Sequence, residues 1–356
     1  MTISGENMLD ITQESASFTP ASSFGNEPLT VLCTLLSRAD NTPLNQRRKG
    51  PLQMLDLYGE VLGDPASTVN AFEAQPNLNF EKWTEYWRKT HGPRFTHALP
   101  TQANGRHPLL RYDQIHRLSA GPSNLRPLPY LPPLDDDGRL FDTVIGHVPE
   151  YQRPEWDGIA YLGFANTDAL QVIFGHEEIT RAILPEDQVI FRELCPVLCR
   201  QHIIIPSATS RESVLLISLV RRNPALSREQ FQHRWLHEYA PRLQAKAATR
   251  RLVTRYVQLH NIGPVDADQP LYHEVGKDID GVAISAFSSI IDLEEFLSDP
   301  DIAALLQTQD GLIDSAQHEY WTALAFQVVN QLPAETRTAS PSPARQDVAA
   351  HAEAAS

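Results

Sequence analysis

The chain has 356 residues, of which 42% are hydrophobic and 21% charged, and its formal net charge is −14. This length leaves room for two or three ordinary domains, each with a buried core. A surface this acidic repels phosphate groups, which argues against both nucleic acid and an anionic membrane as partners.

The N-terminal segment, residues 1–27, is polar and carries neither the basic nor the apolar part of a secretory signal. We expect this segment to be disordered. No apolar run reaches the roughly 18 residues of a membrane-spanning helix. The three cysteines, Cys33, Cys195 and Cys199, form no CxxC pair and no zinc-ligand spacing. Together these features predict a cytoplasmic protein without a metal site.

The first structured half is predicted at residues 28–207. Apolar and β-branched runs predict strands at 29–36, 109–118, 158–164 and 197–205, and helical spacing predicts helices at 80–91 and 167–180. A Pro-rich insertion at 119–155 interrupts this half, because its prolines are incompatible with a regular helix or a central strand. Its apolar residues, such as Leu128 and Tyr130, favour either a loop that packs onto the protein as a lid or a surface excursion.

The second structured half is predicted at residues 208–331. Strands are expected at 213–220, 252–262, 281–290 and 320–329, with one helix after Ser227 and another at 292–306. Ser227 and Gln230 have the spacing of a capping box. Residues 332–356 are rich in Ala, Ser, Pro and Glu. They cannot bury enough apolar surface to offset their ordering entropy, so a disordered tail is predicted.

Three blocks of the first half recur in the second half in the same order. WTEYWRKTHGPRF at 83–95 matches FQHRWLHEYAPRL at 231–243, LLRYDQIHRL at 109–118 matches LVTRYVQLHNI at 252–262, and WDGIAYLGF at 156–164 matches IDGVAISAF at 279–287. The separation of matching blocks decreases along the chain, as expected if the first copy carries the insertion. The chain is therefore predicted to be a tandem duplication of one module.

Each copy has the predicted element order β-α-β-β-α-β, which is that of a ferredoxin-like module with both helices on one sheet face. The other sheet face needs a partner, and fusing two copies supplies one within the chain. We therefore predict an α+β protein, with two ferredoxin-like modules packed sheet to sheet as a fused dimeric α+β barrel. A monomer suffices to close this barrel, and a homodimer is the alternative.

These blocks resemble the EthD domain of the dimeric α+β barrel superfamily. In that family a helix of the form F-x-x-x-W-x-x-x-H-x-P precedes a strand of the form R-Y-x-Q-x-H. The first copy keeps this pattern in Trp83, Trp87, His91, Pro93, Arg111, Tyr112, Gln114 and His116. In the second copy Tyr239 replaces the motif histidine, and His237 lies two residues earlier.

The resemblance implies a class of reaction. Fungal members of the family resemble dehydratases or cyclases of aromatic polyketide pathways, and bacterial relatives include polyketide cyclases and an ether-degradation accessory protein. It implies a cofactor-independent lyase or cyclase that acts on a hydrophobic, polycyclic or polyketide-derived aromatic intermediate of secondary metabolism. The alternatives are a cofactor-free oxygenase or decarboxylase, a non-catalytic ligand-binding or accessory protein, and a haem-binding barrel. The sequence has no GxGxxG, P-loop or GxSxG motif, which disfavours nucleotide cofactors and serine-hydrolase chemistry.

Strand alternation places polar side chains of each copy on one face. These are Tyr112, Gln114 and His116 in the first copy, and Tyr256, Gln258 and His260 in the second. We expect both sets to point into the space between the sheets, while the apolar set packs against helices. There an imidazole could transfer a proton and a phenol could polarise a carbonyl. Hydrogen bonding across the junction between the copies is the structural alternative for His116 and His260.

The motif histidine, His91, is predicted at the C-terminus of its helix, where a protonated imidazole is favoured. It could act as a general acid or an anion anchor, or simply cap the helix. Its counterpart Tyr239 can only donate a hydrogen bond near neutral pH. This difference predicts one competent pocket in the first copy and a mainly structural one in the second.

An enzyme of this kind is expected to have a cavity of roughly 300–1,000 Å³ on which His91 and His116 converge. Further contacts to substrate are predicted for Trp87, Gln114, Trp235, His237, Tyr256 and Gln258. For the two tryptophans the alternative is a role as core anchors.

Overall fold

The structure is a computed structural model that describes residues 29–39, 80–100, 107–129, 153–207, 214–307, 311–332 and 335. The predicted disordered segment 1–27, residues 130–152 of the insertion and most of the predicted tail lie outside the described residues. Within the described ranges, no helix has both the length and the apolar character needed to cross a membrane.

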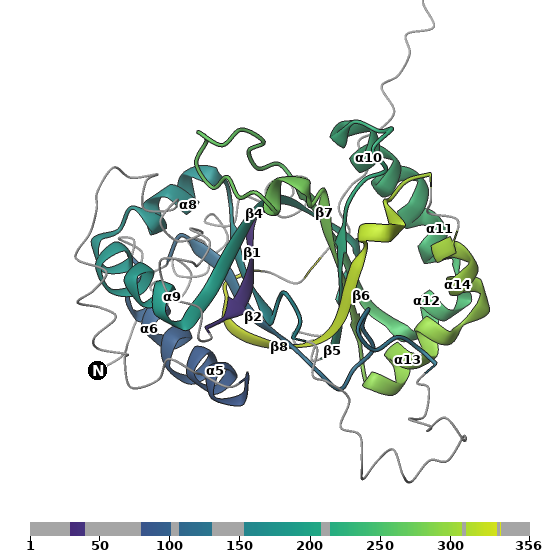
Figure 1. Cartoon of the computed structure of the whole chain (residues 1–356), viewed down its shortest axis with the longest axis horizontal. Coiled ribbons are helices and arrows are strands. Elements are labelled where there is room, and N and C mark those ends of the chain that lie inside the picture. Colours follow the sequence, from purple (N-terminus) through teal and green to yellow (C-terminus); the bar gives the residue numbers. More distant parts are fainter. Residues whose placement is uncertain are drawn as a thin grey trace, which may run out of the picture.

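Eight antiparallel strands form a closed barrel, and the helices lie outside it in two groups on opposite sides (Figure 1). The strands are β1 (Thr30–Arg38), β2 (Leu109–Arg117), β3 (Gly158–Phe164), β4 (Phe191–Ile205), β5 (Val214–Val220), β6 (Val253–Asn261), β7 (Gly281–Phe287) and β8 (Glu319–Asn330). The helices of the first half are α5 (Phe80–Tyr86), α6 (Gly92–His97), α8 (Thr167–Phe174) and α9 (Leu184–Ile190). Those of the second half are α10 (Arg228–Arg234), α11 (Ala240–Ala245), α12 (Ala247–Leu252), α13 (Ile290–Ser298) and α14 (Pro300–Gln307).

The strand order is the same in each half. Around the barrel it runs β4-β1-β3-β2 and then β8-β5-β7-β6. The halves meet where β2 pairs with β8 and β4 pairs with β6. The predicted α+β class and the barrel are therefore confirmed, and the two four-stranded sheets are joined to each other along both edges. Edge pairing satisfies the N–H and C=O groups that an open sheet would leave unpaired.

Apolar side chains fill the barrel interior. Ile115, Ile217, Val257 and Trp321 come from four different strands, and each is no more than 2% exposed. The interior is therefore a core that both halves share.

The prediction that the Tyr-Gln-His sets point into the space between the sheets is wrong. Tyr112, Gln114 and Tyr256 contact the helix layer outside the barrel, whereas Val257 and Leu259 belong to the interior core. The physical reason is that eight inner faces together enclose a large volume best filled by apolar side chains. The polar set instead finds hydrogen-bond partners in the helices.

The glycine of each repeated Asp-Gly pair, Gly158 in the first half and Gly281 in the second, has a packing role. A Cβ on Gly281 would lie 2.3 Å from the Trp235 ring, and one on Gly158 would lie 2.8 Å from the Trp87 ring. Only glycine lets the strand pass this close to the tryptophan of the overlying helix. Both tryptophans thus serve as core anchors.

One end of the barrel is closed by an ion-pair cluster that joins the two halves. Arg111 of β2 and Arg255 of β6, which occupy equivalent positions of the repeat, both contact Glu335. The Arg255 Nη2 to Glu335 Oε1 distance is 2.6 Å, and the Arg111 Nη1 to Glu335 Oε1 distance is 3.1 Å. Arg111 also pairs with Asp113 at 2.6 Å. Glu335 belongs to the segment predicted as a disordered tail, yet its side chain is only 11% exposed.

The described part of the Pro-rich insertion, residues 119–129, packs onto the second half. Ser123 pairs with Trp321 of β8, and the Thr322 backbone amide donates to the Pro122 carbonyl at 3.0 Å. The Asn124 side-chain amide donates to the His318 carbonyl at 2.8 Å. Of the two alternatives for the insertion, this part is a packed loop.

Candidate functional site

The helix that carries the motif does not end at Gly92-Pro93. After α5 the chain widens into a π-helical turn, η2 (Trp87–His91), and continues as α6. The second half repeats this arrangement with η4 (Trp235–Tyr239) between α10 and α11. The prolines are tolerated because each lies in the first turn of the next helical segment, where its missing N–H is not needed.

The motif glutamines hold these π-helical turns against the barrel. Gln114 Nε2 donates to the Trp87 carbonyl at 2.9 Å and lies 3.0 Å from the Tyr112 hydroxyl. In the second half Gln258 Nε2 is 3.2 Å from the Trp235 carbonyl and 3.1 Å from the Tyr256 hydroxyl. The glutamines therefore position the helix and the tyrosine.

The strand histidines stack on the tryptophans of the same turns. The ring centroids of His116 and Trp87 are 4.2 Å apart, and those of His260 and Trp235 are 5.0 Å apart. Burial, with a smaller contribution from Arg88, lowers the pKa of His116 to about 3. Burial likewise holds the pKa of His260 well below its usual range. Both imidazoles are thus neutral at physiological pH, and neither lines either of the two cavities described below.

Replacing Gln114 with alanine is expected to lower the free energy of unfolding by about 1–3 kcal/mol, because two buried polar groups lose a partner. Gln258→Ala removes the same pair of contacts from the second half and should have a similar effect. Urea denaturation of both variants provides the measurement. Unchanged midpoints for both would contradict a positioning role.

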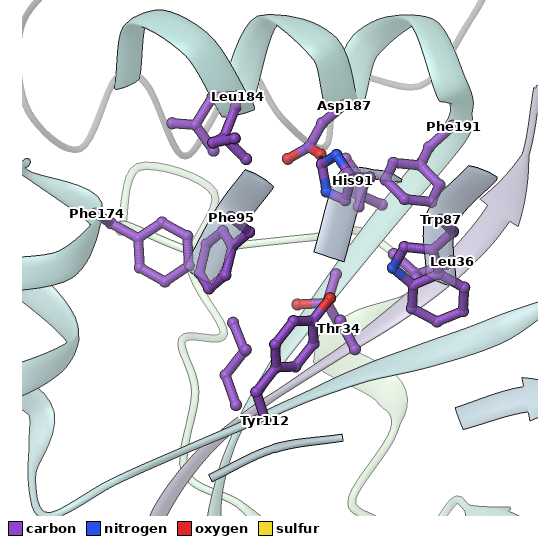
Figure 2. A pocket seen from close by; sticks show the side chains of 14 residues that line it. Thr34, Leu36, Trp87, His91, Phe95, Tyr112, Phe174, Leu184, Asp187 and Phe191 are labelled. Atoms are coloured by element: carbon purple, nitrogen blue, oxygen red, sulfur yellow. The ribbon is translucent and has the colours of Figure 1, made fainter. Parts of the chain in front are cut away.

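The first cavity lies between the motif helix, α9 and the outer face of the barrel, and its volume is about 50 Å³. Its walls are mostly apolar, with aromatic rings from Trp87, Phe95, Phe174 and Phe191. Four side chains bring polar atoms to it: Thr34, His91, Tyr112 and Asp187. Figure 2 shows the His91 imidazole against the Asp187 carboxylate, with the Tyr112 hydroxyl pointing toward the same space.

Two carboxylates flank the motif histidine. His91 is 5% exposed, its Nε2 lies 3.1 Å from Asp187 Oδ1, and its Nδ1 lies 3.4 Å from Glu186 Oε2. Burial alone would lower the pKa of His91, but the charges of Asp187 and Glu186 outweigh it and raise this pKa to about 9. The imidazole is therefore protonated at neutral pH. The cause is this pair of carboxylates rather than the predicted helix C-terminus.

The two carboxylates differ in their surroundings. Glu186 also accepts from Arg94 at 2.7 Å and from the Tyr86 hydroxyl. Burial would raise the pKa of Glu186, but the hydrogen bond and charge of His91 outweigh burial, so this pKa is lowered. For Asp187, burial outweighs the attraction of His91 and the pKa is raised. The sequence does not predict either residue as part of the site, because nothing in their spacing connects α9 to a helix far earlier in the chain.

The second cavity occupies the equivalent place in the other half and has a volume of about 250 Å³. In the first half Leu36 pairs with Gly158, and in the second half Val220 pairs with the equivalent glycine, Gly281. Val220 therefore occupies the position of Leu36. By the same correspondence Ser285 replaces Leu162. The helix positions of Phe95 and Leu243 also match. Three wall positions therefore carry a smaller side chain in the second half, which is one reason why its cavity is larger.

Neither cavity is the expected one of roughly 300–1,000 Å³ on which His91 and His116 converge, because His91 lines only the smaller cavity and His116 lines neither. The larger cavity belongs to the half in which Tyr239 replaces the histidine, and Trp235, Tyr239 and Tyr256 line it. His237 lies outside it, with its ring 4.6 Å from that of His233. His318, which sequence analysis did not single out, lines this cavity, and burial lowers its pKa.

The model of the EthD domain family matches residues 75–191 and 223–316. No curated protein matches the sequence. A solved structure of an anthrone oxidase-like protein is similar over 87% of this chain and 98% of its own, with 12% sequence identity and a TM-score of 0.43. A candidate monooxygenase from Lactobacillus acidophilus NCFM is similar over 86% of this chain and 97% of its own, with 11% identity and a TM-score of 0.40.

Proposed function

The chain belongs to the EthD domain family, and from this premise we propose that it is a cofactor-independent acid–base enzyme. Its reaction is the dehydration or cyclisation of an apolar, polyketide-derived aromatic intermediate. The observation that carries the proposal is the buried His91–Asp187 pair in a largely apolar pocket, with His91 protonated at neutral pH. Strongly perturbed groups that converge on an apolar pocket are typical of active sites.

The polar groups of this pocket have complementary roles in a dehydration. Asp187 accepts the proton from the carbon next to a substrate carbonyl, while His91 donates a proton to the departing hydroxyl, which leaves as water. The proton on Asp187 then returns to His91 across their 3.1 Å contact, which restores the starting state. Tyr112 accepts from Gln114, so its own proton is available to the substrate carbonyl.

The volume of the first cavity sets a condition on this function. About 50 Å³ is far below the roughly 300 Å³ at which small-molecule sites begin. A substrate can therefore enter only when wall side chains of α9, such as Leu184, move aside. Such opening of an apolar wall also explains how the site excludes water once it closes.

We also propose that the chain consists of two ferredoxin-like modules, residues 28–207 and 208–331. The identical strand order of the two halves supports this division. Because the barrel closes within one chain, a monomer is the proposed working form.

The reaction is tested by incubating the purified protein with hydroxylated aromatic polyketide intermediates in chelator-treated buffer and following product mass. A product lighter by one water supports dehydration, and a product of equal mass with a new retention time supports cyclisation. Incorporation of oxygen or loss of carbon dioxide would replace this proposal with the oxygenase or the decarboxylase.

The rate should depend on pH through His91. Since its pKa is raised to about 9, the general acid stays protonated across the neutral range. We expect kcat/KM to fall as the pH rises through about 9. Asp187→Asn removes the main charge that raises this pKa, so residual activity should be lost at a lower pH. An alkaline limb at the same pH in both proteins would contradict the assignment.

A further inference from the structure

We propose that the second cavity is a separate binding site for a neutral, oxygenated aromatic ligand of about two fused rings, and that Leu128 of the first half forms part of its wall. This site is distinct from the proposed active site and does not depend on His91. The ligand is held there and not converted.

The size of the second cavity favours a bound ligand. At about 250 Å³ the second cavity is five times the volume of the first and close to the lower end of the range for small-molecule sites. Three smaller wall residues, Val220, Leu243 and Ser285, contribute to this space. A native core rarely leaves so much room unfilled, because each void forfeits packing energy.

The chemistry of the wall favours a neutral ligand. None of the described residues that line the cavity is Asp, Glu, Lys or Arg, so a charged ligand would lose its hydration without gaining a partner there. Trp235 and Phe296 provide aromatic surface. Among the described residues, no side-chain hydrogen bond is formed by Ser218 or Ser285, which face the cavity from neighbouring strands. These hydroxyls suit the phenol or carbonyl groups of an otherwise apolar ligand.

The other half of the chain supplies part of the wall of the second cavity. Leu128 of the insertion lines the cavity, and the insertion forms hydrogen bonds with the segment that leads into β8. Asn124 donates to the His318 carbonyl at 2.8 Å and accepts from the Tyr320 amide, and both of these partners line the cavity themselves. In Figure 1 the insertion is the blue segment beside α13. The first cavity has no such contribution from the second half among its lining residues.

The second cavity differs from the first in its titratable groups. At the place of His91 it has Tyr239, and among the described residues that line it there is no carboxylate to correspond to Asp187. Burial raises the pKa of Tyr256 above its ordinary value, so this phenol remains a hydrogen-bond donor and does not become a base. His318 lines this cavity, but no described carboxylate lines it, so the histidine–carboxylate pair needed for the proposed reaction is missing among its described residues.

The test is isothermal titration of the full-length chain with 2-naphthol, a neutral bicyclic phenol. We expect saturable binding to one site per chain. The variant Val220→Leu/Ser285→Leu introduces the side chains of the first cavity at the matching positions, and it should weaken naphthol binding by about tenfold or more. His91→Gln should bind naphthol like the wild type even though its turnover is lost, which separates this site from the active site.

A second variant, Leu128→Ala, provides the test if the Val220→Leu/Ser285→Leu protein does not fold. Leu128→Ala lies in the insertion, outside the barrel, so the barrel should keep its melting temperature while naphthol binds several-fold more weakly. The inference is overturned if wild-type protein shows no saturable binding, or if a folded variant of either kind binds naphthol with wild-type affinity.

Discussion

Replacing His91 with glutamine is expected to lower kcat by a factor of about 10²–10⁴, the usual contribution of a general acid. Glutamine retains a polar group of similar reach but cannot transfer a proton. The loss should be far larger in kcat than in KM, because the substrate meets apolar walls that the substitution leaves in place. The measurement is steady-state kinetics, with the substrate that the product-mass experiment identifies.

Three further variants make this result specific. Asp187→Asn should also reduce kcat strongly, since it removes the proposed base and the group that holds the imidazole in its charged form. The double variant should be little worse than either single variant, because residues that act as a unit have non-additive effects. His237→Gln is the control, because this histidine lies outside both cavities and its loss should not change kcat. Full activity of the His91→Gln variant would contradict the proposal.

The second large effect is on stability. Glu335→Gln is expected to lower the free energy of unfolding by roughly 3 kcal/mol, because breaking a buried ion pair leaves its partner charge uncompensated. Arg255, with its side chain 4% exposed, has several hydrogen bonds to this carboxylate. The change would weaken the closure of the barrel at the end where Glu335 joins Arg111 of β2 to Arg255 of β6. Thermal or urea unfolding monitored by tryptophan fluorescence measures it.

The control for this variant is an exposed ion pair. Glu295→Ala removes the partner of Arg251 on the surface and should leave the unfolding midpoint essentially unchanged, because solvent screens such pairs. A wild-type midpoint for the Glu335 variant would show that the C-terminal segment does not contribute to closing the barrel.

The same carboxylate predicts a dependence on pH. Burial opposes ionisation of Glu335, but Arg255 outweighs it, and the pKa is lowered. A carboxylate with a lowered folded-state pKa stabilises the protein above its unfolded pKa, and this stabilisation is lost as the pH falls through the folded value. The stability difference between wild type and Glu335→Gln should therefore shrink in acid.

Much of the fold follows from the sequence because its signals are local. Alternating apolar residues predicted the strands, and the capping box at Ser227 is present as predicted. The fourth strand begins at Phe191 rather than at 197, so it includes Pro196. The duplicated blocks are readable because Trp87 and Trp235 occupy the same structural position, above a glycine in each half.

What the sequence alone determined about this protein is its repeated set of strands and helices and the family to which the repeat belongs. Only the tertiary structure decided which face of each strand is inside the barrel, because alternation distinguishes two faces without saying what covers them. It also decided that Asp187 meets His91, that Glu335 joins two arginines and that the larger cavity lies in the half without the motif histidine. These features depend on contacts between residues far apart in the chain, and no local pattern encodes such contacts.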